Sequence, residues 1–256
     1  MIPYSPEYLA ARDAALRIAT AGFVGVDETD PTGPSGHAYG VNKSAMLTSD
    51  YRKRLKRGIV DVRPEEVIDC MNEAGIKNWC LMGLHGYVGY LPMPRATQDV
   101  DVMVPFSQKK KAADAVAKRW PMLKQVELSQ VVRFMDETDL DPDGNAKPVV
   151  DIMLPWGKFQ KTILKQYVLV NEELRSRYPT LEAAIASKYA ALVSPNRSRD
   201  KKEQDAVDFR RIIRANHKRL NRDVLLLLGN QIWEKGGDEL LSFVDLTKAD
   251  QPLPGV

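Results

Sequence analysis

Two aspartates separated by one residue form the most informative chemical pattern in this chain. Asp99 and Asp101 lie in the run Asp-Val-Asp-Val-Met-Val, which covers residues 99–104. On a strand, alternate side chains point to one face, so the two carboxylates project together while the valines face a core. Two carboxylates held this way repel one another unless a cation or a proton lies between them. They are a natural ligand pair for a hard divalent ion, and the alternative is the polar face of an edge strand.

A third carboxylate lies further along the chain. Asp151 sits inside the apolar run Val149–Leu154. Burying an unpaired carboxylate is costly, so this residue needs a partner. An arginine or a lysine can supply one, and a metal ion shared with Asp99 and Asp101 is the sharper explanation. Three carboxylates on neighbouring strands can hold two Mg²⁺ ions about 3.5–4 Å apart, an arrangement suited to displacement at phosphorus.

The residues before the aspartate pair suit contact with phosphate. Gly83 follows a short apolar stretch and precedes a helical turn. A glycine there lets the backbone approach a phosphate, and the N–H groups of the turn can donate to it. Arg95 can pair with a phosphate or with one of the acidic residues, and Thr97 stands beside the first aspartate.

Together these residues carry a family resemblance. Gly83, followed by Arg95-x-Thr97-x-Asp99-x-Asp101, resembles the signature of the nucleotidyltransferase-fold superfamily, the DNA polymerase β-like proteins. The order of elements over about residues 64–215 looks most like the minimal bacterial type related to the AbiEii toxin. The resemblance implies an enzyme that moves a nucleoside monophosphate from an NTP to a hydroxyl acceptor, with Mg²⁺ or Mn²⁺ as cofactor. It also implies catalytic and metal-binding roles for the three carboxylates, Asp99, Asp101 and Asp151.

The resemblance extends to further residues. It implies nucleotide-binding roles for Gly83, Leu84, Arg95, Thr97 and Lys188. Lys188 would neutralise phosphates, although a lone lysine on an apolar helix is also often an edge residue that extends to solvent. Asp205 and Asp208 lie one helical turn apart, and the resemblance places them toward the cleft. The alternative for this pair is an exposed charged helix.

The elements that must position these residues indicate an α+β fold. We expect an N-terminal helical and loop extension over residues 1–60, a nucleotidyltransferase α/β domain over 61–158, and a helical domain over 159–256. The α/β part would be a small mixed sheet flanked by helices.

Local patterns predict individual elements within this plan. In the first half they predict helices over 5–20, 44–56, 64–73 and 107–120, a loop over 27–40, and strands over 79–82, 100–104, 126–136 and 149–154. The last two strands would be joined by a long hairpin loop over 139–147. In the last third they predict helices over 180–194, 198–218 and 221–235, the last ended by Gly236-Gly237.

Composition restricts the class of protein. The 256 residues carry a formal net charge of +3, and 44% of them are hydrophobic. The two cysteines lack zinc-site spacing, no signal peptide is evident, and no apolar run is long enough to cross a membrane. We therefore expect a cytoplasmic protein with no membrane partner.

The partners and the acceptor are less well defined by the sequence. Besides the NTP, basic clusters such as 52–54 and 109–111 favour an RNA 3′ end over a protein or a small molecule as the acceptor, although such clusters are usually solvated faces. Two other hypotheses stay open. One is a non-catalytic module that binds a nucleotide or a partner, because Leu84 replaces the second small residue usual in the family. The other is the toxin component of a toxin–antitoxin pair, with an antitoxin-like protein as partner.

Overall fold

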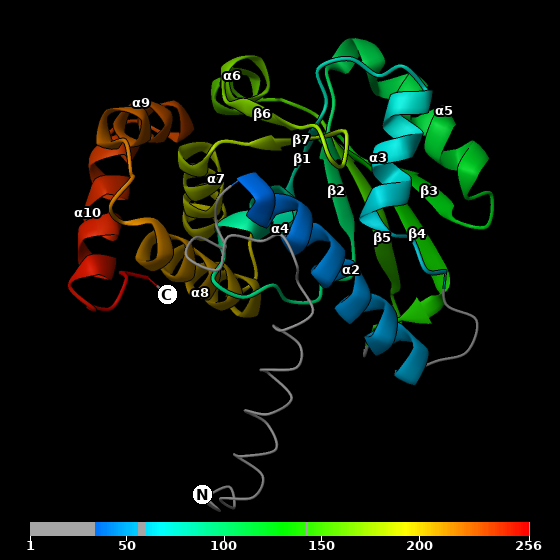
Figure 1. Ribbon diagram of the computed structural model, residues 1–256, viewed down its shortest axis with the longest axis horizontal. Coiled ribbons are helices and arrows are strands. Elements are labelled where there is room, and N and C mark those ends of the chain that lie inside the picture. The colour runs from blue at the N-terminus through cyan, green and yellow to red at the C-terminus, as the bar shows by residue number, and fades with distance from the viewer. Residues whose placement is uncertain (1–33, 56–59, 142, 256) are drawn as a thin grey trace, which may run out of the picture.

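A five-stranded mixed sheet forms the centre of the protein (Figure 1). The computed structural model describes residues 34–55, 60–141 and 143–255. The strands are β1 (Cys80–Leu81), β2 (Val100–Met103), β3 (Lys124–Glu127), β4 (Val131–Leu140) and β5 (Ala146–Met153), in the order β1-β2-β5-β4-β3. The β2 and β5 strands run parallel, and the other neighbouring pairs are antiparallel.

Helices surround this sheet and continue beyond it. Those of the first half are α2 (Pro34–Leu55), α3 (Pro64–Glu73), α4 (Gly83–Tyr87) and α5 (Lys109–Arg119), with the 3₁₀ turns η1 (Val88–Tyr90) and η2 (Phe106–Gln108). Those of the second half are α6 (Lys158–Gln166), α7 (Leu181–Val193), α8 (Arg199–Asn216), α9 (Arg222–Ile232) and α10 (Gly236–Lys248). A two-stranded hairpin, β6 (Val168–Asn171) and β7 (Ser176–Pro179), lies between α6 and α7. The predicted class, α+β with a small mixed sheet and C-terminal helices, is confirmed.

Two apolar cores lie on the two faces of β2. Its valines pack with α3 and α5 in one core, which also holds Phe134 and Ile152. Met103 points the other way, into a second core that includes α4 and the helices α6 to α10. This alternation is the pleat expected for a strand covered on both faces. It places Asp101, between two valines, on the same face as Met103 and the C-terminal helices.

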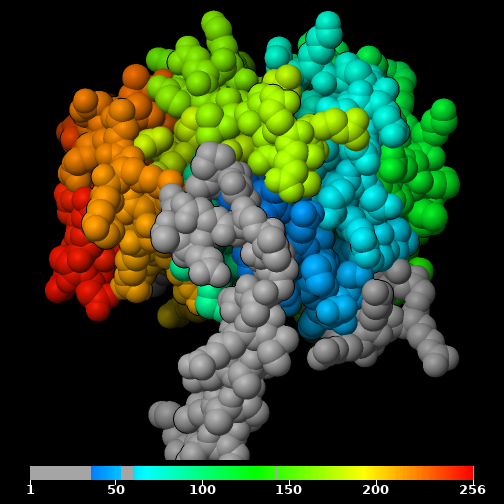
Figure 2. Space-filling model, viewed as in Figure 1, coloured from blue at the N-terminus to red at the C-terminus, as the bar shows by residue number. Residues whose placement is uncertain are grey.

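The α2 helix belongs to the second core. Its Val41 is fully buried there, and the helix lies against η1 and α4 in the ribbon (Figure 1). Figure 2 shows the blue surface of α2 between the cyan α3 region and residues nearer the C-terminus. The predicted loop over 27–40 is wrong from Pro34 onward, because α2 begins there. The helix predicted over 5–20 lies outside the described residues, and the predicted domain boundaries stay predictions.

Several predicted elements match, and others are corrected. The helix over 64–73 is α3, with Pro64 in its first turn and Gly75 just after it in a left-handed conformation. The single strand predicted over 126–136 is wrong: β3 and β4 are two strands joined by a tight turn, in which the Leu128 amide donates to the Val131 carbonyl. The hairpin loop is shorter than 139–147, because β4 continues to Leu140 and β5 begins at Ala146.

The C-terminal end holds a helix that was not predicted. Gly236 and Gly237 begin α10 instead of only ending the preceding helix. A side chain added at Gly229 of α9 would place its Cβ 2.6 Å from the Gly237 Cα, so the two helices meet through their glycines. A Gly-Gly pair commonly ends a helix, and here a close contact between helices requires it. The α6 helix and the β6–β7 hairpin were also not predicted.

No helix within the described residues has both the length and the apolar composition needed to cross a bilayer.

Candidate metal and active site

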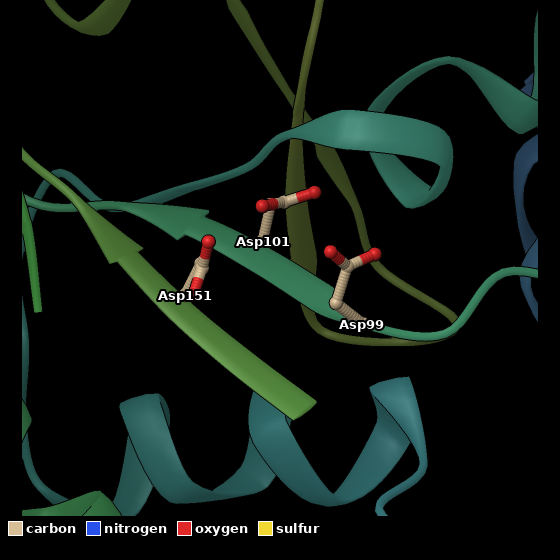
Figure 3. A group of neighbouring side chains, drawn as sticks. All are labelled: Asp99, Asp101 and Asp151. Atoms are coloured by element: carbon tan, nitrogen blue, oxygen red, sulfur yellow. The ribbon is translucent and has the colours of Figure 1, made fainter. Parts of the chain in front are cut away.

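The structure brings Asp99, Asp101 and Asp151 together (Figure 3). Asp101 and Asp151 are direct partners in the parallel register of β2 and β5. Asp99 lies one residue before β2 begins. One carboxylate oxygen from each residue lies within 4.8 Å of the other two, so the three side chains can hold a metal ion.

Burial and charge repulsion raise the pKa values of two of these carboxylates. Burial, together with the charges of Asp99 and Asp151, raises the pKa of Asp101 well above its ordinary value, against the charges of Lys188 and Arg133. Burial and the charge of Asp151 also raise the pKa of Asp99, against a hydrogen bond from Thr97. Both shifts mean that the ionised carboxylates are destabilised where they stand. A bound cation would remove that penalty.

Arg133 meets one of the three carboxylates. Its guanidinium donates to both oxygens of Asp151, at 2.7–3.1 Å. The sequence left two partners open for Asp151, an arginine or a shared metal, and the structure shows the arginine. Three carboxylates with one guanidinium still leave negative charge uncompensated, and carboxylate oxygens are the ligands that Mg²⁺ and Mn²⁺ prefer. The residues therefore fit a divalent ion.

Gly83 lies against this group. Its φ of +53° belongs to the left-handed region that favours glycine. A Cβ at this position would lie 1.9 Å from the Asp101 Oδ2 atom, so no other residue fits without displacing the carboxylate. The structure thus places the Gly83 backbone at the metal-site carboxylates. Leu84 buries its side chain in the core, which leaves only its backbone for contact with a ligand.

Thr97 and Arg95 occupy different surroundings. Thr97 Oγ1 donates to Asp99 Oδ1 at 3.2 Å, so it belongs to the carboxylate group. Arg95 instead pairs with Asp208 of α8, with Nη2 at 2.8 Å from Oδ2 and Nε at 3.3 Å from Oδ1. The sequence left a phosphate or an acidic residue as the partner of Arg95, and the structure shows an acidic residue.

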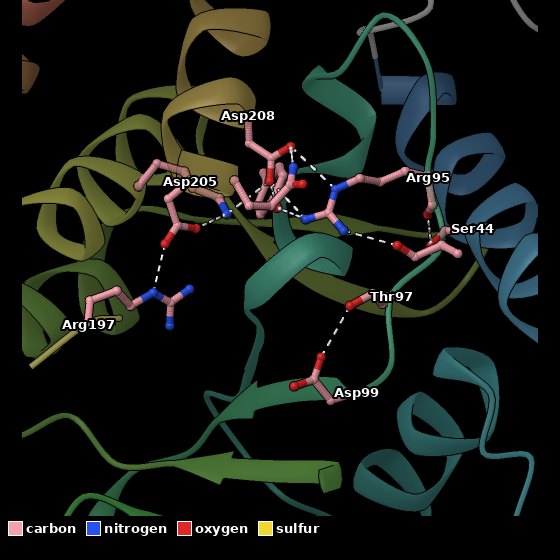
Figure 4. A network of polar contacts seen from close by, with 11 residues as sticks. Ser44, Arg95, Thr97, Asp99, Arg197, Asp205 and Asp208 are labelled. Atoms are coloured by element: carbon pink, nitrogen blue, oxygen red, sulfur yellow. Dashed lines mark hydrogen bonds and ion pairs between the residues drawn. The ribbon is translucent and has the colours of Figure 1, made fainter. Parts of the chain in front are cut away.

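Lys188 of α7 and Asp205 and Asp208 of α8 form another group, which is buried. Figure 4 shows Asp205 and Asp208 with their polar contacts. The Lys188 amine lies 2.7 Å from Asp205 Oδ1 and 3.2 Å from Asp208 Oδ2, and 4.3 Å from the centre of the Tyr87 ring. Asp205 also accepts from Arg197 Nε at 2.8 Å. All three residues of the group are buried, so neither the solvent-extended lysine nor the exposed charged helix describes them.

Asp208 is the most densely bonded residue of this second group. Its side chain is completely buried and accepts hydrogen bonds from the Tyr87 hydroxyl, Arg95, Lys188 and Gln204. Burial opposes its ionisation, but the hydrogen bond from Arg95 and the charge of Lys188 hold its pKa below the ordinary value. The roles that the resemblance assigns to this group, phosphate contact and a place at the cleft, stay predictions.

Sequence reasoning missed two residues that shape these groups. Arg133 is the cross-strand partner of Asp151 in the antiparallel register of β4 and β5. Strand bounds alone would not have revealed this pair, because two register shifts lie between the β4–β5 turn and Arg133. Tyr87 lies four residues after Gly83, on α4, and no local motif marks it.

His85 lies on α4, two residues after Gly83. It is buried, burial lowers its pKa to about 3, and neither ring nitrogen has a hydrogen-bond partner among the described residues. It lines a small cavity together with Thr48, Thr97 and Asp99. Nucleotide contact therefore stays open for this residue.

Comparison with known proteins adds little to the geometry. No protein-family model and no curated protein matches the chain. Among solved structures, the chain is similar to an antigenic nucleotidyltransferase-like protein from Paracoccidioides brasiliensis, with 15% sequence identity and a TM-score of 0.42. The match covers 71% of this chain and 89% of that one.

Proposed function

We propose that the protein is a metal-dependent nucleotidyltransferase that moves a nucleoside monophosphate from an NTP to a hydroxyl acceptor. The convergence of Asp99, Asp101 and Asp151 on two adjacent parallel strands carries this proposal. Their negative charge exceeds what Arg133 supplies, and oxygen ligands suit Mg²⁺ or Mn²⁺. The motif before them, from Gly83 to Thr97, supports the same reaction class by resemblance.

Each residue of the site has a proposed task. Asp99, Asp101 and Asp151 would hold the divalent ion, which when bound would acidify the acceptor hydroxyl and stabilise the leaving pyrophosphate. Thr97 would orient the Asp99 carboxylate through its hydrogen bond. Gly83 would admit the nucleotide phosphates beside Asp101, since a larger residue there would meet the carboxylate oxygen.

The remaining nucleotide contacts in the proposal are constrained by what the side chains already do. Leu84 can contribute only its backbone, because its side chain is 3% exposed. Lys188 has one donor beyond the two that face Asp205 and Asp208, so phosphate contact would use that donor or replace a partner. Arg95 would reach a phosphate only with the part of its guanidinium that Asp208, Tyr87 and the Ala96 carbonyl leave free.

Incorporation of label from NTPs labelled at the α-phosphate tests this proposal. We expect Mg²⁺- or Mn²⁺-dependent incorporation by the wild type and its loss in the Asp99→Asn/Asp101→Asn double variant. One transition-state electrostatic contact is worth about 10²–10³-fold in rate, so losing two ligands should abolish measurable transfer. Asp114→Asn, at an exposed carboxylate on α5, is the matched control and should leave activity unchanged. Equal incorporation by the wild type and the double variant would contradict the proposal.

One observation favours a second candidate, a non-catalytic nucleotide-binding module. Arg133 occupies both oxygens of Asp151, and within the described part of the chain Asp99 and Asp101 have no ion pair. In that case an NTP would bind equally well with and without Mg²⁺, and Asp99→Asn would not change its affinity. Calorimetric titration of an NTP under both conditions separates this candidate from the transferase.

The finer parts of the sequence hypothesis stay proposals. An RNA 3′ end, a protein or a small molecule remains the proposed acceptor, and a cytoplasmic location remains an expectation. The toxin hypothesis, with an antitoxin-like partner, predicts growth arrest on expression that the Asp99 or Asp101 substitution relieves. Absence of arrest in the wild type would count against it.

A further inference from the structure

Asp99 is held differently from the other two carboxylates. Asp101 and Asp151 lie within the paired strands β2 and β5, whose ladder fixes their backbones. Asp99 precedes that ladder, so its position depends on residues 91–99, which form neither helix nor strand. The backbone polar groups of such a segment need partners from elsewhere in the protein.

The α2 helix supplies several of these partners from one face. Ser44 and Thr48 lie four residues apart, so their side chains share a face of the helix. Ser44 Oγ donates to the carbonyl oxygen of Arg95 at 2.7 Å. Thr48 Oγ1 accepts a hydrogen bond from the amide of Thr97 at 3.1 Å and donates to the Ser44 carbonyl at 2.8 Å. Both hydroxyls are buried, so water does not readily replace these bonds.

Arg52 continues the same face by one more turn. Its guanidinium donates to the Gln98 carbonyl oxygen, next to Asp99. It also donates to the Val60 carbonyl and to Asp61, each at 3.3 Å. The residues at positions 44, 48 and 52 therefore bind backbone groups of residues 95, 97 and 98 in order along the chain.

We propose that α2 is a positioning element for Asp99, with Thr48 as its central contact. This inference rests on the proposed function, because it concerns a ligand of the proposed metal site. Thr48 fixes the Thr97 backbone, and the Thr97 hydroxyl in turn bonds to Asp99 Oδ1 (Figure 4). A shift of Thr97 therefore moves the Asp99 carboxylate relative to Asp101 and Asp151. On the other side, Asp208 holds the side chain of Arg95, so the segment is held by α2 and α8 together.

Substitution of Thr48 by valine tests the inference. Valine has nearly the same shape as threonine but cannot accept the Thr97 hydrogen bond. Loss of a residue that orients a metal ligand costs about 10–100-fold in metal affinity, and we expect about 10-fold weaker Mn²⁺ binding by calorimetry. Thr48→Ser keeps the hydroxyl and should restore wild-type affinity. Met46→Ala, at an exposed position of α2, is the control for general weakening of the helix.

Amide hydrogen exchange without metal supplies a second, independent measurement. We expect Thr48→Val to speed exchange in the peptide that covers residues 95–99, and Thr48→Ser and Met46→Ala to leave it unchanged. Ser44→Ala should give a smaller increase in the exchange rate, and this variant provides the test if the valine variant does not fold. Wild-type exchange and wild-type Mn²⁺ affinity in Thr48→Val would overturn the inference. A wild type that binds no Mn²⁺ would instead contradict the proposed function, and exchange would then decide the positioning role alone.

Discussion

The metal-site group (Asp99, Asp101 and Asp151) and the α7–α8 group differ in how their charge is compensated. Among the described residues, the metal-site group has three carboxylates and one ion-pair partner, Arg133. The α7–α8 group has two carboxylates, Asp205 and Asp208, and three cationic partners, which are Arg95, Lys188 and Arg197. Both groups lie near α4, which contributes Gly83 to the first and Tyr87 to the second.

This difference indicates a different role for each group. A buried charge is tolerated when it is paired and hydrogen-bonded, as Asp208 is by four side chains. A group with excess charge of one sign lowers stability, and proteins retain such groups where function needs them. We therefore propose that the metal-site group binds a cation and that the α7–α8 group fixes the surrounding segments.

Removing Asp208 from the α7–α8 group should have the largest effect on stability. Asp208→Ala would leave Lys188 and Arg95 with fewer partners in a buried environment. Breaking a buried ion pair on one side costs about 3–5 kcal/mol, and we expect a loss of this size in denaturant unfolding. Glu203→Ala on the exposed face of the same helix removes only a surface pair with Arg199, worth about 0.3–0.5 kcal/mol. Similar losses for the two variants would show that the Asp208 network is not the support inferred here.

Binding of a divalent ion to the metal-site group should give the second-largest change in the stability of the protein. A ligand that binds only the folded state adds about 2.7 kcal/mol at 100 times its dissociation constant. Wild type should therefore melt at a higher temperature with Mg²⁺ or Mn²⁺ than with chelator. Asp114→Asn should respond as the wild type does, and Asp99→Asn/Asp101→Asn should not respond. An equal shift in all three proteins would place the binding elsewhere.

Removing one negative charge from the metal-site group should stabilise the metal-free protein. We expect Asp101→Asn, in chelator, to raise the free energy of unfolding by about 0.5–2 kcal/mol at neutral pH. The pKa values of Asp99 and Asp101 are raised in the folded protein, so the contribution of these groups to stability is fully present below pH 3.8. That contribution is lost as the pH rises through their folded-state pKa values. The advantage of the variant should therefore grow above pH 3.8 and disappear below it.

The contribution of Asp208 to stability should depend on pH in the opposite direction. The pKa of Asp208 is lowered in the folded protein, so its contribution to stability is present above pH 3.8. That contribution is lost as the pH falls through the folded-state pKa. The destabilisation by Asp208→Ala should thus shrink in acid, while the gain from Asp101→Asn also shrinks. Urea unfolding across the pH range measures both trends. A gain from Asp101→Asn that does not change with pH would contradict the charge explanation.

The parts of the molecule that follow from short-range rules could be predicted from the sequence. The helix over 64–73 depends on Pro64 at its start and Gly75 beyond its end, and both signals act locally. The convergence of Asp99 and Asp101 depends on strand periodicity. Asp151 was identified because a carboxylate in an apolar run needs a partner. The structure brings these three carboxylates together as predicted, although their catalytic role stays a prediction.

Other features depend on register and could not be predicted this way. Arg133 meets Asp151 because β4 and β5 pair at that register, which two register shifts between the hairpin turn and Arg133 set. Asp205 and Asp208 look like surface charges in a polar helix. Their burial depends on α7 and α4 packing over them, where Lys188 lies 17 residues from Asp205 and Tyr87 lies 121 residues from Asp208 in the chain.

By itself, the sequence determined which residues are able to bind a metal ion, because residue type and strand periodicity are local properties. Only the tertiary structure decided which charges meet a partner. Arg95 pairs with Asp208, Arg133 pairs with Asp151, and Asp101 lies near Asp99 and Asp151, whose charges raise its pKa. The physical reason is that electrostatic balance depends on distance in space and on burial, and packing between distant segments sets both.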